Sequence, residues 1–333
     1  MEFTMGGRLE VRMTPADVGK RVSVRRAVGP VGEGAKFTDT LGVLTSWDDG
    51  VVSVTTRSGE IVRIAESALV AGKVVPPAPA RRRGPAASFA ELALATARAW
   101  QPVESEPLGE WRLRAAGGFT RRANSVLPLG DPGMPLGEAL GRVGRWYGER
   151  GLPAYIQTAT GAEGTQERLC ADLEEHGWRR EVTAEVRVAA LAPIGDLDVD
   201  VSAVRLSRRP DEAWLSRYQR FETPGPEVLK VLGSGPSVWF ASVPGDDAAG
   251  VPAAIGRCVV DGRWTGFMAV EVGPEHRRRG LATAVMAALA RTALDEGASA
   301  AWLQVEADNG GARALYDGMG FATHHRYHHF RSA

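Results

Sequence analysis

The chain has 333 residues, of which 44% are hydrophobic and 24% are charged. This composition is typical of a globular protein rather than a disordered one, and the length favours two or three domains. The 40 Lys and Arg residues balance the 40 Asp and Glu residues. The net charge therefore gives no indication that the chain as a whole binds nucleic acid or an acidic membrane surface.

The cysteines and the apolar stretches bear on the cellular compartment. Cys170 and Cys258 are the only cysteines, and their wide separation predicts two small buried side chains rather than a disulfide framework. No stretch approaches about 18 consecutive apolar residues, and residues 1–11 lack the apolar segment of a signal peptide. We expect a cytoplasmic protein without a membrane span.

Residues 1–75 have the pattern of a small all-β domain. Short segments of alternating apolar and polar residues are joined by turns such as Asp48-Asp49-Gly50 and Arg57-Ser58-Gly59, which is the pattern of β-hairpins. Five short strands in such a length resemble an SH3-like barrel. The segment holds 10 Lys and Arg against 9 Asp and Glu. These numbers give no indication of a basic face. We therefore favour docking of a protein partner or a structural role over nucleic-acid binding for this domain. The strands are expected at 21–25, 41–47, 51–56 and 61–64, with a further strand elsewhere in the segment.

Residues 76–87 are rich in proline and include Arg81-Arg82-Arg83, which predicts an extended, solvated linker. A second domain is expected at 88–195 and a third at 196–333. In both, strands alternate with helices, so we expect α+β and α/β architecture, with a mixed twisted sheet flanked by helices. In the second domain helices are expected at 89–100, 136–150 and 166–176, and strands at 111–114, 123–127 and 154–157. From residue 199 the expected order is strand, helix, helix, three strands, helix, strand, helix, strand.

The loop that follows the strand at 265–274 has the features of an anion site. It runs Glu275-His-Arg-Arg-Arg-Gly-Leu-Ala282 into a helix at 283–296, and contains Arg277-x-x-Gly280-x-Ala282. Backbone N–H groups at a helix start lack intrahelical partners and lie at the positive end of the helix dipole. A glycine there lets a diphosphate approach closely, and arginines add charge-assisted bonds. Alone, the pattern also fits an ordinary helix start.

A second block follows about thirty residues later. A strand at 301–305 leads to Asn309 and then to Ala312-x-x-Leu315-Tyr316-x-x-x-Gly320-Phe321. The two blocks in this order closely resemble the GNAT (Gcn5-related) N-acetyltransferase superfamily, over about 130 residues from 199 to 330. The whole chain resembles three-part proteins of GC-rich bacteria, with an SH3-like N-terminal domain and two GNAT-like halves.

The resemblance implies acetyl-CoA as the acetyl donor. Backbone amides from Arg278 to Thr283 would hold the diphosphate, Val270 and Val272 would pair with the pantetheine arm, and Asn309 would bond to the pantetheine region. Tyr316 would face the sulfur and protonate the leaving thiolate. The cofactor-binding residues implied are Val270, Val272, Arg277, Arg278, Arg279, Gly280, Leu281, Ala282, Thr283, Asn309 and Tyr316.

Some of these residues also have structural interpretations. Asn309 would cap the following helix in either case, and Tyr316 would pack beside Ala312, four residues earlier. The general base is open: Glu271 and Glu306 are the two candidates, although strand alternation places Glu271 opposite Val270 and Val272, and a chain of water molecules is the alternative.

The histidines of the run His324-His325-x-x-His328-His329 do not predict a metal site. In a strand His324 and His328 face one way and His325 and His329 the other, so four ligands cannot converge. We expect instead a terminal strand at the edge of the substrate cleft.

The second domain is interpreted as a degenerate GNAT-like copy. Leu173-x-x-x-Gly177-Trp178 is similar to the motif around Tyr316, but residues 130–136 stand where a diphosphate loop would lie and contain no Arg-x-x-Gly pattern. The expected activity is transfer of acetyl from acetyl-CoA to a primary amine of a small molecule, a peptide or a protein lysine. The alternative is a non-catalytic acyl-CoA sensor or scaffold with the barrel as interaction module; an intact Tyr316 favours the enzyme.

Overall fold

The structure is a computed structural model, and it describes residues 10–28, 36–76, 84–218, 225–245 and 250–332. The run Arg81-Arg82-Arg83 and most of the expected linker lie outside these ranges. No helix in the described ranges is both long enough and apolar enough to cross a membrane.

The N-terminal domain is a six-stranded sheet in the order β1-β6-β2-β3-β4-β5. The predicted strands lie within β2 to β5, and β3 and β4 are joined by a two-residue turn in which Asp49 and Gly50 both have positive φ, of 50° and 74°. Such a turn matches the twist of a hairpin. The elements are β1 (Val11–Arg12), η1 (Pro15–Asp17), β2 (Arg21–Val28), β3 (Lys36–Asp48), β4 (Val51–Thr56), β5 (Ile61–Ala65), η2 (Glu66–Ala68) and β6 (Leu69–Val74).

The middle segment holds a three-stranded sheet, β7-β8-β9, with helices around it. The predicted helices are confirmed, but the strand predicted at 123–127 is wrong, because the side chain of Asn124 binds the backbone of a loop there and only Leu127 enters a strand. The elements are α1 (Phe89–Ala99), β7 (Glu104–Leu108), β8 (Trp111–Ala115), η3 (Arg121–Ala123), β9 (Leu127–Pro128), α2 (Leu136–Gly148), β10 (Tyr155–Thr160), α3 (Glu167–Glu175), β11 (Arg179–Ala190) and α4 (Ala192–Gly195).

The C-terminal segment has the order of elements predicted from the sequence. One short 3-10 helix, η4, lies between the third consecutive strand and the next helix. The elements are β12 (Arg205–Ser207), α5 (Glu212–Arg217), α6 (Pro226–Leu232), β13 (Ser237–Val243), β14 (Ala254–Asp261), β15 (Trp264–Val272), η4 (Pro274–His276), α7 (Leu281–Asp295), β16 (Ala300–Glu306), α8 (Gly310–Gly318) and β17 (Ala322–Arg331).

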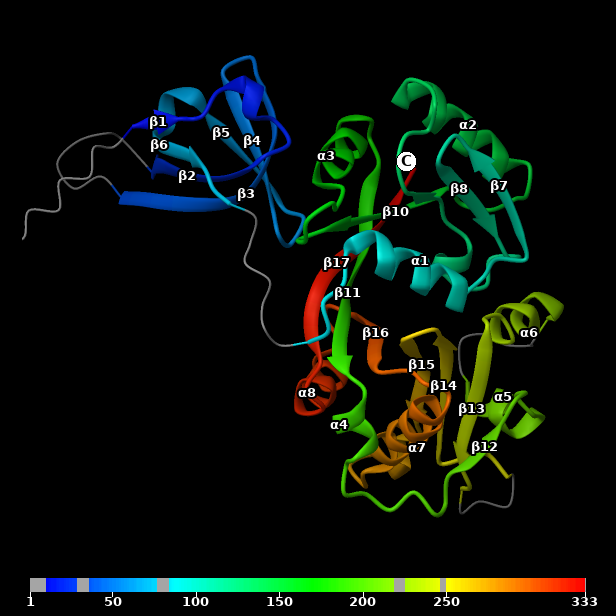
Figure 1. Cartoon of the computed structure of the whole chain (residues 1–333). Helices are drawn as coiled ribbons and strands as arrows, with labels where there is room; N and C mark the ends of the chain where they lie inside the picture. Colours follow the sequence, from blue (N-terminus) through cyan, green and yellow to red (C-terminus); the bar gives the residue numbers. More distant parts are fainter. Residues whose placement is uncertain (1–9, 29–35, 77–83, 219–224, 246–249, 333) are drawn as a thin grey trace, which may run out of the picture.

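One eight-stranded sheet joins the middle and C-terminal segments (Figure 1), in the order β10-β17-β11-β16-β15-β14-β13-β12. The last strand of each segment lies in the other segment's part of the sheet: β17 pairs with β10, and β11 pairs with β16. The two strands also pair with each other over most of their length. Strands from both sides of the expected boundary at 195/196 therefore alternate within one sheet.

The C-terminal half of this sheet is covered on both faces. On one face α4, α7 and α8 pack over an apolar cluster that includes Phe267, Leu303 and Val305. On the other face α1, α5 and α6 pack over a second cluster that includes Met268 and Trp302. Neighbouring strand residues alternate between these two faces. We call them the α7 face and the α1 face.

The two cysteines are both free and fully buried, as predicted. Burial raises the pKa of the Cys170 thiol and of the Cys258 thiol to about 12. Neither thiol is therefore ionised at neutral pH, and both act as small core side chains.

Candidate active site

An opening between β15 and β16 is the central feature of the site. The two strands are parallel, and they pair only from Trp264 with Ala300 to Phe267 with Leu303. Beyond that point β15 continues to Val272 and β16 to Glu306 without pairing to each other. Backbone N–H and C=O groups that lack a ladder partner are ready to bind an extended ligand. The opening lies at the carboxyl ends of the two strands.

A β-bulge lies in β15 where the strands part. Ile255 is in register with Glu271 and Arg257 with Met268, so β15 has one residue more than β14 between these pairs. Ala269 has a φ of 51°, which is uncommon for a residue with a side chain. As a result Ala269 packs on the α1 face together with Met268, whereas Val270 and Val272 pack on the α7 face.

The N-terminus of α7 borders the same opening. Its N-cap is Gly280, with a φ of 77° and no side-chain cap hydrogen bond, and its first intrahelical bond runs from the Ala284 N–H to the Gly280 carbonyl at 3.0 Å. The N–H groups of residues 281–283 precede that bond, so the helix itself supplies them with no partner. A side chain at position 280 would meet no atom within 4 Å. The glycine therefore provides both the backbone conformation and open space in front of the helix.

The loop before α7 carries positive charge, and its first residues are held by a buried arginine of α5. Arg277, Arg278 and Arg279 are exposed, and Arg278 has a φ of 63°. Arg217 of α5 is buried; it donates to the Pro252 carbonyl at 2.7 Å and pairs with Glu275 at 3.2 Å. This anchor holds the start of the loop, and within the loop the Arg279 guanidinium bonds the His276 ring at 2.9 Å. The sequence predicted these residues around the helix start, and α7 begins two residues earlier than expected, at Leu281.

The helix α8 places Asn309 and Tyr316. The Asn309 side chain accepts the Ala312 N–H at 3.0 Å, so it caps the helix. Tyr316 is 9% exposed, and its ring packs in the α7-face cluster, with its centroid 5.9 Å from that of Phe321. Burial raises the pKa of the Tyr316 hydroxyl to about 12, against the opposing charge of Arg187. The phenol therefore stays protonated throughout the neutral and alkaline range.

The two carboxylates predicted as general bases lie on the two strands that border the opening. Glu271 is partly buried near the end of β15, and Glu306 is exposed at the end of β16. Glu271 lies between Val270 and Val272, which pack on the α7 face, so alternation puts its side chain on the α1 face. Glu306 follows Val305 and has the same orientation by the same argument. Both candidates thus lie on the face opposite α7.

A loop of the middle segment contacts β16 on the α1 face beside the opening, which the sequence analysis missed. Arg122 of this loop donates to the side chain of Gln304 on β16, and its guanidinium carbon lies 4.7 Å from the ring centroid of Trp100. No motif marks this loop, and Arg122 is separated from Gln304 by 182 positions in the chain. Only the three-dimensional fold brings the two residues together.

The histidine run is only partly as predicted. Val186 pairs with His325 and Arg187 with Thr323, so His324 is the extra residue of a bulge. The simple alternation predicted for His324 is therefore wrong, and its ring contacts the Ala87 carbonyl and His325. Within the described ranges, no three His, Cys, Asp or Glu side chains are arranged to hold a metal ion.

His328 and His329 lie at the far end of this run, in different surroundings. His328 is bonded by the hydroxyls of Thr160 and Thr183, each at 2.9 Å. His329 packs against the rings of Tyr155 and Tyr327. Both histidines are therefore built into the sheet core rather than exposed at a cleft edge.

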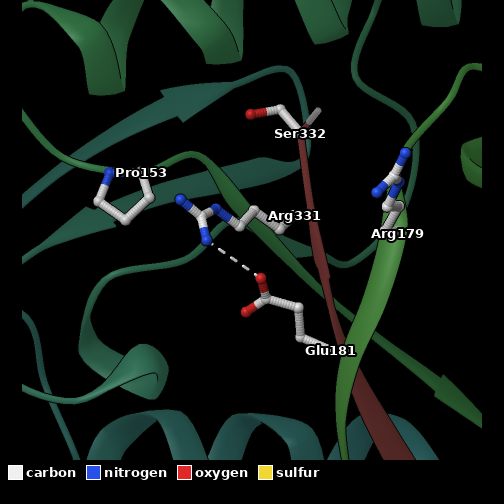
Figure 2. Close-up of a pocket in the computed structure, with 5 residues that line it drawn as sticks. All are labelled: Pro153, Arg179, Glu181, Arg331 and Ser332. Carbon is white, nitrogen blue, oxygen red and sulfur yellow. Dashed lines mark hydrogen bonds and ion pairs between the residues drawn. The ribbon is translucent and has the colours of Figure 1, made fainter.

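Two hollows lie away from this opening, both in or beside the middle segment. One, of about 410 Å³, lies at the end of β17, where Arg331 is already paired with Glu181 at 3.2 Å (Figure 2). The other, of about 720 Å³, includes residues 130–132 of the stretch that stands in place of a diphosphate loop. Its charged lining residues are Asp131, Arg168 and Asp172. Two carboxylates against one guanidinium do not favour a diphosphate there.

Comparisons with known proteins identify the family of the chain. A family model described as "Probable histone acetyltransferase Rv0428c C-terminal" matches residues 87–330, and one described as "Rv0428c N-terminal Sm-like domain" matches residues 16–73. "Probable histone acetyltransferase Rv0428c" of Mycobacterium tuberculosis is 30% identical over 318 residues, which are 92% of this chain and 93% of that protein.

Two further similarities extend to other bacteria. The "Uncharacterized N-acetyltransferase YobR" of Bacillus subtilis is 27% identical over 70% of this chain and 94% of its own. A solved GCN5-related N-acetyltransferase from Kribbella flavida covers 73% of this chain and 95% of its own, with a TM-score of 0.54 at 16% identity, which shows a shared fold.

The family match, the relatives and the shared fold define an acyltransferase of the GNAT superfamily. Within that class, the chain belongs to the family whose catalytic part is described by the model of the Rv0428c C-terminal region and whose N-terminal part is Sm-like. The resemblance inferred from the two sequence blocks is thereby confirmed. The small all-β domain at the N-terminus is confirmed as well, and its closer likeness to an SH3-like barrel stays a prediction.

Proposed function

We propose that this protein transfers the acetyl group of acetyl-CoA to a primary amine, and that the opening between β15 and β16 is where transfer occurs. The observation that carries the proposal is one parallel strand pair that parts directly beside an uncapped helix N-terminus. Acetyl-CoA needs both features, because its diphosphate is anionic and its pantetheine arm is an extended chain of amides. Acetyl-CoA supplies an activated thioester; the protein supplies position and proton transfer.

The cofactor would lie along the α7 face. The free N–H groups of Leu281, Ala282 and Thr283 and the exposed arginines 277–279 fit the diphosphate. The backbone of Val270 and Val272, beyond the last pair with β16, fits the pantetheine amides. Asn309 already uses its side-chain oxygen to cap α8. Its amide nitrogen is the atom we assign to the cofactor.

Proton transfer would use groups on both faces of the opening. Glu271 or Glu306, or water held by them, would take a proton from the incoming amine on the α1 face. Tyr316 would donate its hydroxyl proton to the departing thiolate on the α7 face. A phenol with a pKa of about 12 is a weaker acid than a typical thiol, whose pKa is near about 8.5. Tyr316 therefore acts mainly by hydrogen bonding to the thiolate as charge develops there.

The experiment is a screen for release of coenzyme A from acetyl-CoA across amine acceptors. It should include lysine-containing peptides, because the relative from M. tuberculosis is named a probable histone acetyltransferase. Amine-dependent release with an acetylated product identified by mass spectrometry is the expected result. Binding of acetyl-CoA without transfer to any amine would instead support the alternative, a non-catalytic sensor or scaffold. In that case the buried Tyr316 would serve only in packing.

A further inference from the structure

The structure assigns Arg122 a role in the choice of acceptor: we propose that its guanidinium binds an oxyanion, a carboxylate or a phosphate, on the amine that is acetylated. The inference rests on the function proposed above and names the class of acceptor for that site. Arg122 would then be a residue of the middle segment that determines specificity in a reaction whose other groups come from the C-terminal segment.

The loop that carries Arg122 is held in one conformation by Asn124. The buried Asn124 side-chain oxygen accepts the N–H groups of Ala116 at 2.8 Å and Gly118 at 3.0 Å. Its side-chain nitrogen donates to the carbonyls of Phe119 and Thr120, each at 2.8 Å. These four bonds satisfy every donor and acceptor of the amide. The loop is therefore preorganised rather than free to adapt.

The same loop contains a strained residue directly before the arginines. Thr120 has a φ of 57°, and its hydroxyl accepts the indole N–H of Trp100 at 2.9 Å. With a ψ of 139°, this is a backbone conformation that a β-branched residue rarely adopts, and such strain persists where the surroundings enforce it, often at functional sites. Trp100 is buried, so it fixes both Thr120 and the guanidinium that stacks on its ring.

Arg122 lies at the opening on the acceptor side. Its partner Gln304 is one residue beyond Leu303, the last residue of β16 in register with β15. Leu303 and Val305 pack on the α7 face, so Gln304 and Arg122 lie on the opposite face. The diphosphate of acetyl-CoA is assigned to the α7 face. The anion that Arg122 would bind therefore belongs to the acceptor and not to the cofactor.

Arg122 differs from its neighbour Arg121 in the ionic contacts of its guanidinium. Within the described ranges no Asp or Glu oxygen lies within 4.0 Å of its guanidinium, whereas its neighbour Arg121 pairs with Glu181 at 3.7 Å. The partner that Arg122 does have, Gln304, is neutral. A planar guanidinium presents five donors, so one bond to Gln304 leaves an edge for bidentate contact with an oxyanion.

Two buried arginines add to this excess of positive charge. Arg114 donates to Ser125 and Gln157, and Arg257 donates to backbone carbonyls, so both are bonded to neutral groups. Burial is the main cause that lowers the pKa of Arg257 to about 9, and the charge of Arg122 acts in the same direction. An acceptor that carries a negative group would supply the missing countercharge. An acceptor with additional positive groups would be repelled.

The test uses full-length protein and pairs of amines that differ only in the anionic group. The carboxylate pairs are β-alanine, 4-aminobutyrate, 6-aminohexanoate and L-lysine, each against its amide; the phosphate pair is phosphoethanolamine against ethanolamine. For the pair whose chain length fits the site, we expect kcat/KM to be about 10- to 100-fold higher for the anionic amine than for its neutral counterpart. This is the effect of a charge-assisted hydrogen bond. Arg122→Gln should reduce that ratio to about one, and Arg122→Lys should keep part of it. Comparing each ratio in the variant with that in the wild type cancels differences in amine pKa.

Controls separate specificity from folding. Arg112→Gln changes an exposed arginine of β8 that bonds only to Ser105, and should leave the ratio unchanged. Acetyl-CoA affinity and the thermal midpoint should be the same in wild type and Arg122→Lys. An unchanged ratio in Arg122→Gln, or faster acetylation of a basic lysine peptide than of an acidic one by the wild type, would overturn the inference.

A failure of the proposed function gives a different result. If no amine is acetylated, Arg122 can still be tested by titrating the protein with N-acetyl-β-alanine and with its amide, using tryptophan fluorescence to measure binding. Stronger binding of the carboxylate that is lost in Arg122→Gln would support the oxyanion site, and equal binding of the two probes by the wild type would contradict it.

Discussion

The guanidinium of Arg257 donates to the backbone carbonyl of Ala99 at 3.1 Å, which links the centre of β14 to the last turn of α1. The same side chain donates to the Leu232 carbonyl at 2.7 Å, at the end of α6. Helix C-termini carry partial negative charge, so two of them stabilise a buried cation that pairs with no carboxylate among the residues the structure describes. Arg257 thereby joins the middle segment to the C-terminal segment on the face where the acceptor is expected.

Replacing this arginine should lower the stability of the whole body formed by the two segments. Arg257→Leu leaves the carbonyls of Ala99, Leu232 and Ser234 buried without that donor. Each such group costs about 1–3 kcal/mol, so we expect a loss of several kcal/mol in the free energy of unfolding, measured with urea. Arg112→Leu, on the exposed side of β8, is the matched control and should change it by less than about 0.5 kcal/mol. Equal losses of stability in the two variants would show that the hydrogen bonds of Arg257 are unimportant for stability.

Stability should fall as the solution becomes acidic because of buried histidines. Burial lowers the pKa of His328 to about 3, against an unfolded value near about 6.5. As the pH falls, the unfolded chain therefore binds the proton before the folded protein does. The contribution of neutral His328 to the free energy of unfolding is intact above a pH of about 6.5 and is lost progressively as the pH falls toward 3. His325 has the same direction of shift.

A single variant isolates this effect. His328→Gln keeps a side chain able to bond Thr160 and Thr183 but cannot be protonated, so its thermal midpoint should decline less between pH 7 and pH 5 than that of the wild type. His176→Gln, at an exposed position, should follow the wild type. Parallel curves for all three proteins would contradict the assignment.

The N-terminal domain should fold alone. Its own apolar cluster includes Val22, Val54 and Ile64, all of them buried. It meets the rest of the protein partly through the turn of Arg57 and Ser58, whose carbonyls accept bonds from Thr160 and Arg180. A fragment of residues 1–76 should give a folded β spectrum by circular dichroism and unfold cooperatively. An unfolded spectrum, with the remainder of the chain also unstable, would show instead that this domain is an integral layer.

Tyr316→Phe should retain affinity for acetyl-CoA and lower turnover. The ring packs against Phe321 and keeps its volume, so only the hydroxyl is lost. Loss of a hydrogen bond to the developing thiolate should lower kcat by roughly 10- to 100-fold, and the loss should be smaller at low pH, where solvent supplies a proton to the thiolate. Because the pKa of Tyr316 is about 12, ionisation of this group should not limit the wild-type rate below that pH. Unchanged turnover at every pH would mean that Tyr316 only packs.

Local patterns predicted much of this protein. The order of elements from residue 199, the hairpins of the N-terminal domain and the presence of a helix after the turn at Gly280 each depend on neighbouring residues, so periodicity and turn chemistry were enough to predict them. The two GNAT blocks supplied the family for the same reason. The residues of each block are close in sequence.

Features formed by distant residues escaped the sequence analysis. The pairing of Thr183 with His328 joins positions 145 apart, and no local pattern encodes the exchange of β11 and β17 between the two segments. The apolar residues around Asn124 suggested a strand, but the side chain of Asn124 competes for the backbone bonds a strand would need. Arg257 lies in the middle of β14 among apolar neighbours, and its burial is explained by the ends of α1 and α6, which no local pattern places there.

The most direct test of the central claim is a calorimetric titration of acetyl-CoA into the wild type and two variants of Gly280. A left-handed conformation is accessible to Asn and Asp at modest cost, and space at this position is open, so both variants should fold. Gly280→Asn and Gly280→Asp differ by one negative charge in front of the helix N-terminus. We predict about one equivalent bound to the wild type, weakened binding to Gly280→Asn and no detectable binding to Gly280→Asp. Two equal sites in the wild type, or wild-type affinity in Gly280→Asp, would contradict a single acetyl-CoA site at the start of α7.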